Sequence, residues 1–265
     1  MHRFSARLLV SAALLVSLAS GGCSTLQMAS SDTTGSIGSA PRSEAQWREE
    51  MNIWGQRHQA NPRDAEAAMN YAQALRAIGQ RSQATAVLEQ AAIHNPENRA
   101  LLGAYGRALA DNGNFKQALD VLARAHSPDQ PDWRILSVQG AVYDQMGRHQ
   151  DAQRYYASAL RLKPDDPSVL SNLGLSYALS KDLPKAEATL RRAAARPGAE
   201  PKVRQNLALV VGLQGRFKEA EAIASGDLSP TEAAANVAYL RQMLAKQGDL
   251  KQKHGVSPLA QATGL

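Results

Sequence analysis

Small and apolar residues recur at a fixed spacing along most of the chain. Three registers of small residues step by 34 positions, with larger apolar residues between them at the three- and four-residue spacing of a helix face. The first register is occupied by Ala84, Ala118, Ala152, Ala186 and Ala220. The second is occupied by Ala72, Gly106, Gly140, Gly174 and Ala208. The third is occupied by Gly79, Gly113, Gly147 and Gly215, with Lys181 in the remaining place. This period predicts a repeated unit of two helices joined by a tight turn.

Each register has a physical reason in such a unit. Glycine at the eighth place of the first helix, as at Gly106, Gly140 and Gly174, allows the second helix to approach closely, and the alanine register is its counterpart on the second helix. Glycine at the fifteenth place closes the first helix, because it adopts the left-handed conformation without strain. A 34-residue unit of this kind resembles the tetratricopeptide repeat (TPR). We therefore predict an all-α TPR α-solenoid of about five helix-turn-helix repeats, with a capping helix at each end.

Prolines set the expected boundaries. Pro96, Pro131 and Pro164 lie where the second helix of a repeat must stop. The repeats are expected over 65–228, in units of 65–98, 99–132, 133–166, 167–200 and 201–228. Lone helices over 44–62 and 231–247 are expected to cover the two ends, and 248–265 is expected to be a polar tail.

The first 43 residues differ in composition from the repeats. Two arginines, an apolar run too short to span a membrane and several small residues predict a signal peptide over 1–22. The only cysteine, Cys23, follows directly. Small residues before a cysteine resemble the cleavage motif of bacterial lipoproteins, and this resemblance implies lipidation of Cys23. Plain secretion with a free thiol is the alternative. Residues 23–43, rich in Ser, Thr and Gly, are expected to form a flexible tether.

Composition and motifs exclude or disfavour several classes of function. With 44% hydrophobic residues the chain is globular in type, and one cysteine excludes an intramolecular disulfide and a cysteine-based zinc cluster. The net charge of +6 is spread without blocks of like charge, which disfavours a nucleic-acid surface. No phosphate-binding loop, paired metal-ligating histidines or nucleophile elbow occurs in the sequence. We therefore predict no enzyme, no cofactor, no metal and no small-molecule substrate.

The remaining candidate is a groove for protein partners. In the predicted fold the side chains at places two, five, nine, twelve and thirteen of each first helix line the concave face. These side chains are polar in the first three repeats and apolar in the last two, where an amphipathic helix of a partner would fit, unless the terminal helix covers the apolar stripe. Asparagines at the sixth place can pair with a bound peptide or serve the repeat itself. The candidate groove residues are Arg76, Arg107, Arg134, Asn172, Leu175, Leu179, Asn206, Leu209 and Leu213.

The end of the chain carries the most specific resemblance. Residues 228–244, with the sequence LSPTEAAANVAYLRQML, together with the lipoprotein-like start, resemble the TadD family, the TPR lipoproteins of the tight adherence (Tad/Flp) pilus system. The resemblance implies a pilotin-like lipoprotein, anchored by lipid at the periplasmic face of the outer membrane, that helps the pilus secretin to localise or assemble. An outer-membrane barrel-assembly lipoprotein and a generic envelope TPR scaffold are the alternatives.

Overall fold

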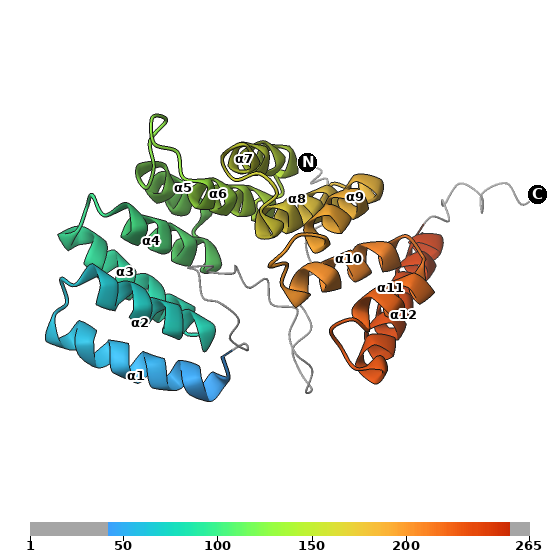
Figure 1. Cartoon of the computed structure of the whole chain (residues 1–265), viewed down its shortest axis with the longest axis horizontal. Helices are drawn as coiled ribbons and strands as arrows, with labels where there is room; N and C mark the ends of the chain where they lie inside the picture. The colour runs from blue at the N-terminus through green and yellow to red at the C-terminus, as the bar shows by residue number, and fades with distance from the viewer. Residues whose placement is uncertain (1–41, 255–265) are drawn as a thin grey trace, which may run out of the picture. The chain divides into compact units, whose positions relative to one another are not determined.

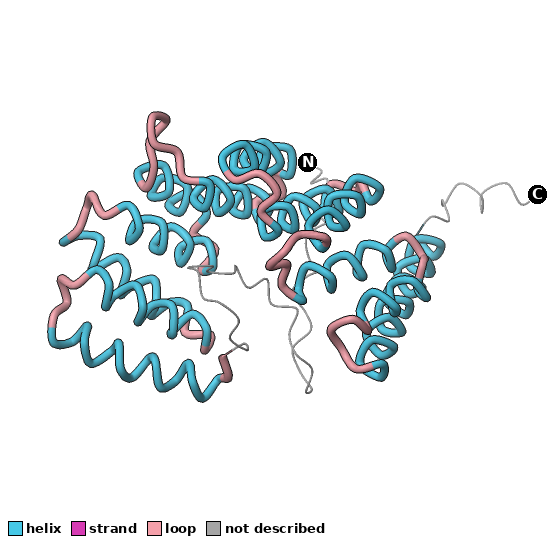
Figure 2. Tube along the Cα trace, viewed as in Figure 1, coloured by secondary structure: helices cyan, strands magenta, loops and turns pink. Residues whose placement is uncertain are grey.

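The computed structural model describes residues 42–254, with side chains described as far as Lys246. The signal peptide, Cys23, nearly all of the tether and the end of the tail lie outside the described residues. Twelve helices fill the described part, which contains no strand beyond one isolated bridge (Figures 1 and 2). They are α1 Glu44–Ala60, α2 Ala65–Ala77, α3 Arg81–His94, α4 Arg99–Asp111, α5 Phe115–Arg124, α6 Trp133–Gln145, α7 His149–Leu162, α8 Pro167–Leu179, α9 Leu183–Ala194, α10 Pro201–Leu213, α11 Phe217–Ala224 and α12 Pro230–His254.

The helices pack as hairpins that stack on one another, as Figure 1 shows for consecutive pairs. We call the first helix of each pair helix A and the second helix B. Helices α2 to α11 form five such pairs, and each following helix A packs against the helix A and helix B before it. Helix α1 packs on α2, and α12 packs on α10 and α11. The predicted all-α solenoid of paired helices, with a further helix at each end, is therefore confirmed.

Helix α12 differs from its expected length. It continues to His254, whereas a polar tail was expected from residue 248. The residues after Gly248 are mostly good helix formers and include no proline before the helix ends, so one glycine is insufficient to end it.

Close helix packing explains the small-residue registers. A Cβ atom added to Gly106 would lie 2.5 Å from Leu122 Cγ, and one added to Gly174 would lie 2.6 Å from Leu190 Cγ. At Gly140 the added atom would lie 2.7 Å from Tyr156 Cε1. The alanines of the first register have no exposed surface. The two helices of a repeat therefore touch where the sequence keeps its smallest residues.

The backbone conformation at the turns explains the third register. Gly79, Gly113, Gly147 and Gly215 have φ angles between 74° and 83°, in the left-handed region. Lys181 occupies the same place with a φ of 68°, and it carries the steric cost of a side chain in that conformation.

Helix A also begins in a repeated way. Asp64, Asn98, Asp132 and Asp166 are N-caps whose side chains accept backbone N–H groups of the first turn. Glu200 stands at the same place before α10 and makes no such bond; Pro201 follows it at the first helical position.

One helix B is shorter than its neighbours on either side. Helices α3 and α7 have 14 residues, but α5 has 10 and ends at Arg124, well before Pro131, the expected stop. Pro128 occupies the place at which α3 ends with His94 and α7 with Leu162. Because proline disfavours the helical conformation of the residue before it, the last turn of α5 is replaced by a loop over 125–132.

Candidate functional site

The apolar members of the groove form a stripe on two neighbouring helices A. Leu175 and Leu179 belong to α8, and Leu209 and Leu213 belong to α10. All four are half-buried, and none belongs to a hydrophobic core cluster of the described residues. These four leucines are called the leucine stripe below.

Helix α12 does not cover the half of the leucine stripe on α8. The described part of α12 packs against α10 and α11 and makes no contact with α8. Helix α12 contacts α10 through small residues of α10 that are not part of the leucine stripe. Leu240 of α12 lies against Gly212, and Ala233 of α12 packs with Ala208. Helix α12 thus occupies the place of a sixth helix A, and Leu175 and Leu179 remain open to solvent on their exposed sides.

The asparagines of the groove tie neighbouring repeats together. Asn206 donates from Nδ2 to Ser171 Oγ over 3.0 Å, and its side chain is 6% exposed. Asn172 repeats the arrangement one unit earlier with Ser137, over 3.4 Å. Asn206 is therefore committed to the repeat stack, which leaves the leucines as the better candidates for partner contact.

The three arginines have different surroundings. Arg76 Nε donates to Asp111 Oδ2 in the next repeat over 2.7 Å, and the arginine side chain is only 14% exposed. Arg107 is half-buried and also engaged with its neighbours. Arg134 is exposed, and its guanidinium carbon lies 4.6 Å from the centre of the Trp133 ring. Arg134 is thus the most accessible cation of the predicted groove.

A buried polar cluster joins the third and fourth repeats. Asp144 Oδ1 accepts from His149 Nδ1 over 2.9 Å and from Ser176 Oγ over 2.7 Å, and Oδ2 accepts from Tyr156 OH over 3.1 Å. Burial raises the pKa of Asp144 and raises that of Tyr156 well above its ordinary value. These groups come from α6, α7 and α8, so the cluster fixes the junction of two repeats.

Serine, histidine and aspartate also form the catalytic triads of hydrolases. The geometry excludes a triad here, because Ser176 donates to the carboxylate of Asp144 and not to the ring of His149. The cluster is structural, and sequence reasoning missed it because its members lie up to 32 residues apart.

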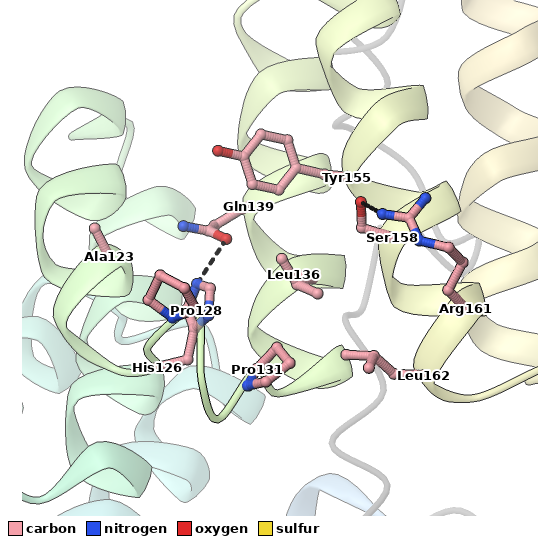
Figure 3. Close-up of a pocket in the computed structure, with 10 residues that line it drawn as sticks. All are labelled: Ala123, His126, Pro128, Pro131, Leu136, Gln139, Tyr155, Ser158, Arg161 and Leu162. Carbon is pink, nitrogen blue, oxygen red and sulfur yellow. Dashed lines mark hydrogen bonds between the residues drawn. The ribbon is translucent and has the colours of Figure 1, made fainter.

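A cavity of about 440 Å³ opens where the last turn of α5 is missing (Figure 3). Its wall combines the end of α5, the 125–132 loop, α6 and α7. The lining residues are Ala123, His126, Pro128, Pro131, Leu136, Gln139, Tyr155, Ser158, Arg161 and Leu162. None of them belongs to the groove predicted from the sequence.

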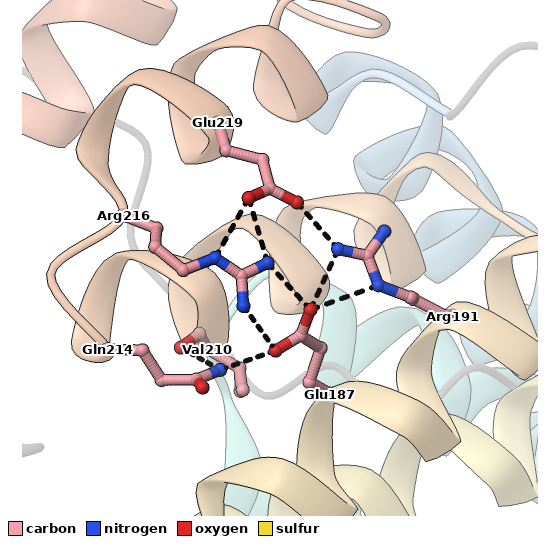
Figure 4. Close-up of polar contacts among 6 residues, drawn as sticks. All are labelled: Glu187, Arg191, Val210, Gln214, Arg216 and Glu219. Carbon is pink, nitrogen blue, oxygen red and sulfur yellow. Dashed lines mark hydrogen bonds and ion pairs between the residues drawn. The ribbon is translucent and has the colours of Figure 1, made fainter.

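An ion-pair network crosses helices B of the last two repeats (Figure 4). Glu187 accepts from Arg216, Gln214 and Arg191, with the shortest Arg216 contact at 2.7 Å. The Arg216 guanidinium, supported by Gln214 and Arg191, lowers the pKa of Glu187 to about 2. Glu219 closes the network by accepting from both arginines. The network links α9 to α11.

The described residues contain neither a helix suited to span a membrane nor a cluster suited to hold a metal ion. No helix in the range 42–254 combines the length and apolarity needed to cross a bilayer. No group of three His, Cys, Asp or Glu side chains suited to a metal ion occurs in the described part of the chain.

Comparison with known proteins supports the repeat assignment. Two family models described as tetratricopeptide repeat match residues 79–141 and 138–200. No curated protein sequence matches the chain significantly. Residues 79–200 therefore carry tetratricopeptide repeats, and the described helices form a TPR scaffold.

Solved structures share this fold at low sequence identity. PilW, described as a widely conserved type IV pilus biogenesis factor, is 16% identical with a TM-score of 0.62, over 73% of this chain and 91% of PilW. A thermophilic TPR protein of Thermus thermophilus is 23% identical with a TM-score of 0.59, over 68% of this chain and 100% of that one. A TPR protein of Parabacteroides merdae is 13% identical with a TM-score of 0.64, over 74% of this chain and 78% of that one. At these identities the similarity concerns the fold.

Proposed function

We propose that this protein is a partner-binding adaptor of Tad/Flp pilus assembly, anchored by lipid on Cys23 at the periplasmic face of the outer membrane. The observation that carries the adaptor function is the leucine stripe, half-buried on α8 and α10 and outside the core clusters. Four leucines at helical spacing on two adjacent helices suit the apolar face of an amphipathic helix. The proposed occupant is a helical segment of the pilus secretin.

The pilus assignment has two supports of different kinds. Residues 228–244 resemble the TadD family, and most of them form the first part of α12. The fold resembles PilW, which is described as a type IV pilus biogenesis factor. The first support concerns sequence and the second concerns architecture, and both are compatible with an envelope protein that serves pilus assembly.

The proposed anchor separates attachment from recognition. Cys23 precedes the first described helix by about 20 residues rich in serine, threonine and glycine. Such a segment lets a TPR scaffold search for partners close to the membrane. A single acyl chain binds membranes weakly, so stable anchoring of the mature protein requires more than one chain.

The test is capture of partners from crosslinked envelopes, with mass spectrometry as the readout. The wild type is compared with Leu209→Glu, which places a charge in the leucine stripe. The matched control is Ile93→Glu, because Ile93 is 72% exposed on the helix B α3. We expect the wild type and the control to recover a secretin, and Leu209→Glu to lose it.

Other outcomes contradict parts of the proposal. Equal recovery by Leu209→Glu, at unchanged thermal stability, contradicts binding at the leucine stripe. Recovery of barrel-assembly components in place of pilus components contradicts the pilus assignment. Normal outer-membrane fractionation of Cys23→Ser contradicts the lipid anchor.

A further inference from the structure

The cavity beside α5 results from a local break in the repeat. In the regular repeats the end of helix B packs against the next helix A, but Pro128 removes the last turn of α5. The loop that replaces this turn is held by a backbone bridge between Ser127 and Gln130. Helices α5 and α6 therefore make few contacts with each other. The cavity is the space that the missing turn would otherwise occupy.

The cavity surface is mainly apolar, and its polar lining residues are neutral or basic. Pro128, Pro131, Leu136 and Leu162 are among its lining residues, and Leu162 is 44% exposed although it is a large apolar side chain (Figure 3). No acidic residue is among the lining residues. An apolar group that entered this cavity would shield surface that the chain leaves exposed to water.

The polar lining groups leave hydrogen-bonding capacity unused. His126 pairs through Nε2 with Gln139 Oε1 over 3.2 Å, while its Nδ1 atom is buried and has no hydrogen-bond partner. Arg161 donates to Ser158 Oγ over 2.8 Å and pairs with no carboxylate in the described part of the chain. Arg161 therefore keeps donors for a carboxylate, whereas the buried Nδ1 of His126, which is the ring's acceptor when Nε2 donates to Gln139, offers none.

Charged residues of both signs are sequence neighbours of the lining residues. Arg124 follows the lining residue Ala123, and Lys163 follows Leu162. Neither forms an ion pair within residues 42–246, and Arg124 donates only to the backbone carbonyl of Pro96. Two acidic residues stand beside the lining prolines: Asp129 follows Pro128, and Asp132 follows Pro131 and caps α6 by accepting the Arg134 N–H group. These four neighbouring charges therefore balance, and Arg161 is the one Lys, Arg, Asp or Glu among the lining residues, which favours an acidic ligand.

We propose that this cavity is a second docking site, which takes an extended acidic segment of a partner protein. An apolar side chain of the segment enters between Pro128, Leu136 and Leu162, and a neighbouring carboxylate pairs with Arg161. A second copy of this chain is a poor occupant because it is also net basic, with 30 Lys and Arg against 24 Asp and Glu, two of the arginines lying in the proposed signal peptide. The site shares no residue with the leucine stripe, so one molecule can hold two partner segments at once.

A short peptide serves as the probe. In an extended chain residues two apart lie on one face, so acetyl-Ser-Glu-Ser-Leu-Ser-Glu-Ser-amide presents leucine between two carboxylates. For the measurement, fluorescein on a Gly-Gly spacer replaces the acetyl group; the labelled peptide is titrated with the full chain, and binding is followed by fluorescence anisotropy. Peptides with leucine replaced by alanine, or with both glutamates replaced by glutamine, are the ligand controls.

Three protein variants separate the cavity from general charge. Arg161→Gln removes the cation, and Ala123→Phe fills the cavity from an exposed position on α5. Arg154→Gln is the control for charge, because Arg154 lies on the same helix as Arg161, is not itself a lining residue, and is already paired with Asp151. We expect about tenfold weaker binding for Arg161→Gln and Ala123→Phe, as for loss of one charge-assisted bond or of the apolar insertion, and unchanged binding for Arg154→Gln.

The proposal is overturned if the peptide does not bind, or if both control peptides bind as tightly as the parent peptide. It is also overturned if the Ala123→Phe variant binds the parent peptide as tightly as the wild type does. Leu209→Glu distinguishes this site from the proposed function, since it should abolish secretin capture and leave peptide affinity unchanged. Loss of peptide binding in Leu209→Glu, with thermal stability retained, would show that the peptide occupies the leucine stripe.

Discussion

Replacing Gly174 by alanine tests whether helix contact within a repeat depends on a missing side chain. The new Cβ atom would lie 2.6 Å from Leu190 Cγ and 3.3 Å from the carbonyl oxygen of Ala186. Cγ is the branch point of a fully buried leucine, and the oxygen is part of the α9 backbone. The oxygen cannot move without shifting α9, and Cγ can move only if Leu190 changes its χ1 rotamer inside a packed core, so the contact is relieved at the expense of helix packing.

Two opposing terms set the size of the effect. Alanine in place of glycine inside a helix stabilises by about 1 kcal/mol, through backbone entropy. Overpacking of a close contact costs about 1 to 3 kcal/mol. We expect net destabilisation of about 1 kcal/mol, which lowers the melting temperature by roughly 2 to 4 °C in a protein of this size.

Gly103→Ala is the matched control. Its added Cβ would also lie 2.6 Å from a neighbour, but that neighbour is Ile135 Cδ1, the far end of a flexible side chain. Because this methyl group can move aside, we expect Gly103→Ala to be neutral or stabilising by up to about 1 kcal/mol. Urea unfolding followed by far-ultraviolet circular dichroism measures both variants. A Gly174→Ala variant as stable as Gly103→Ala would refute the reasoning.

Two further predictions concern the turns and the ion-pair network. Lys181→Gly should stabilise the protein by about 1 kcal/mol, because it removes a lysine from the left-handed conformation. Gly147→Lys should destabilise it by about the same amount, because it introduces one. Melting temperatures of both variants equal to that of the wild type would contradict this. Glu187→Gln should cost about 1–2 kcal/mol at neutral pH, since the arginine partners are partly exposed and screened. The folded pKa of Glu187, about 2, is below its ordinary 4.5, so this stabilisation is fully present above pH 4.5 and is lost as the pH falls towards 2. The stability difference between wild type and variant, measured by thermal melts, should therefore shrink from about pH 7 to about pH 3; a constant difference would exclude an ionic role.

Much of the fold follows from the sequence because it depends on local chemistry. The 34-residue step places a glycine where the turn needs a positive φ, and a small residue where two helices touch. The N-caps Asp64, Asn98, Asp132 and Asp166 follow the same step, so the sequence also held this signal. Each of these features involves one residue and the backbone or helix beside it, which a periodic pattern specifies directly.

The tertiary structure decided which side chains of different repeats meet. It paired Asn206 with Ser171, gathered His149, Ser176 and Tyr156 around Asp144, and placed α12 against α10 and α11 but not against α8. A repeat pattern fixes the buried face of each helix, but contacts between repeats depend on the relative positions of helices about 30 residues apart in the chain. The cavity beside α5 has the same origin. Pro128 is visible in the sequence, but the space left by the lost turn exists only once α6 and α7 are packed around it.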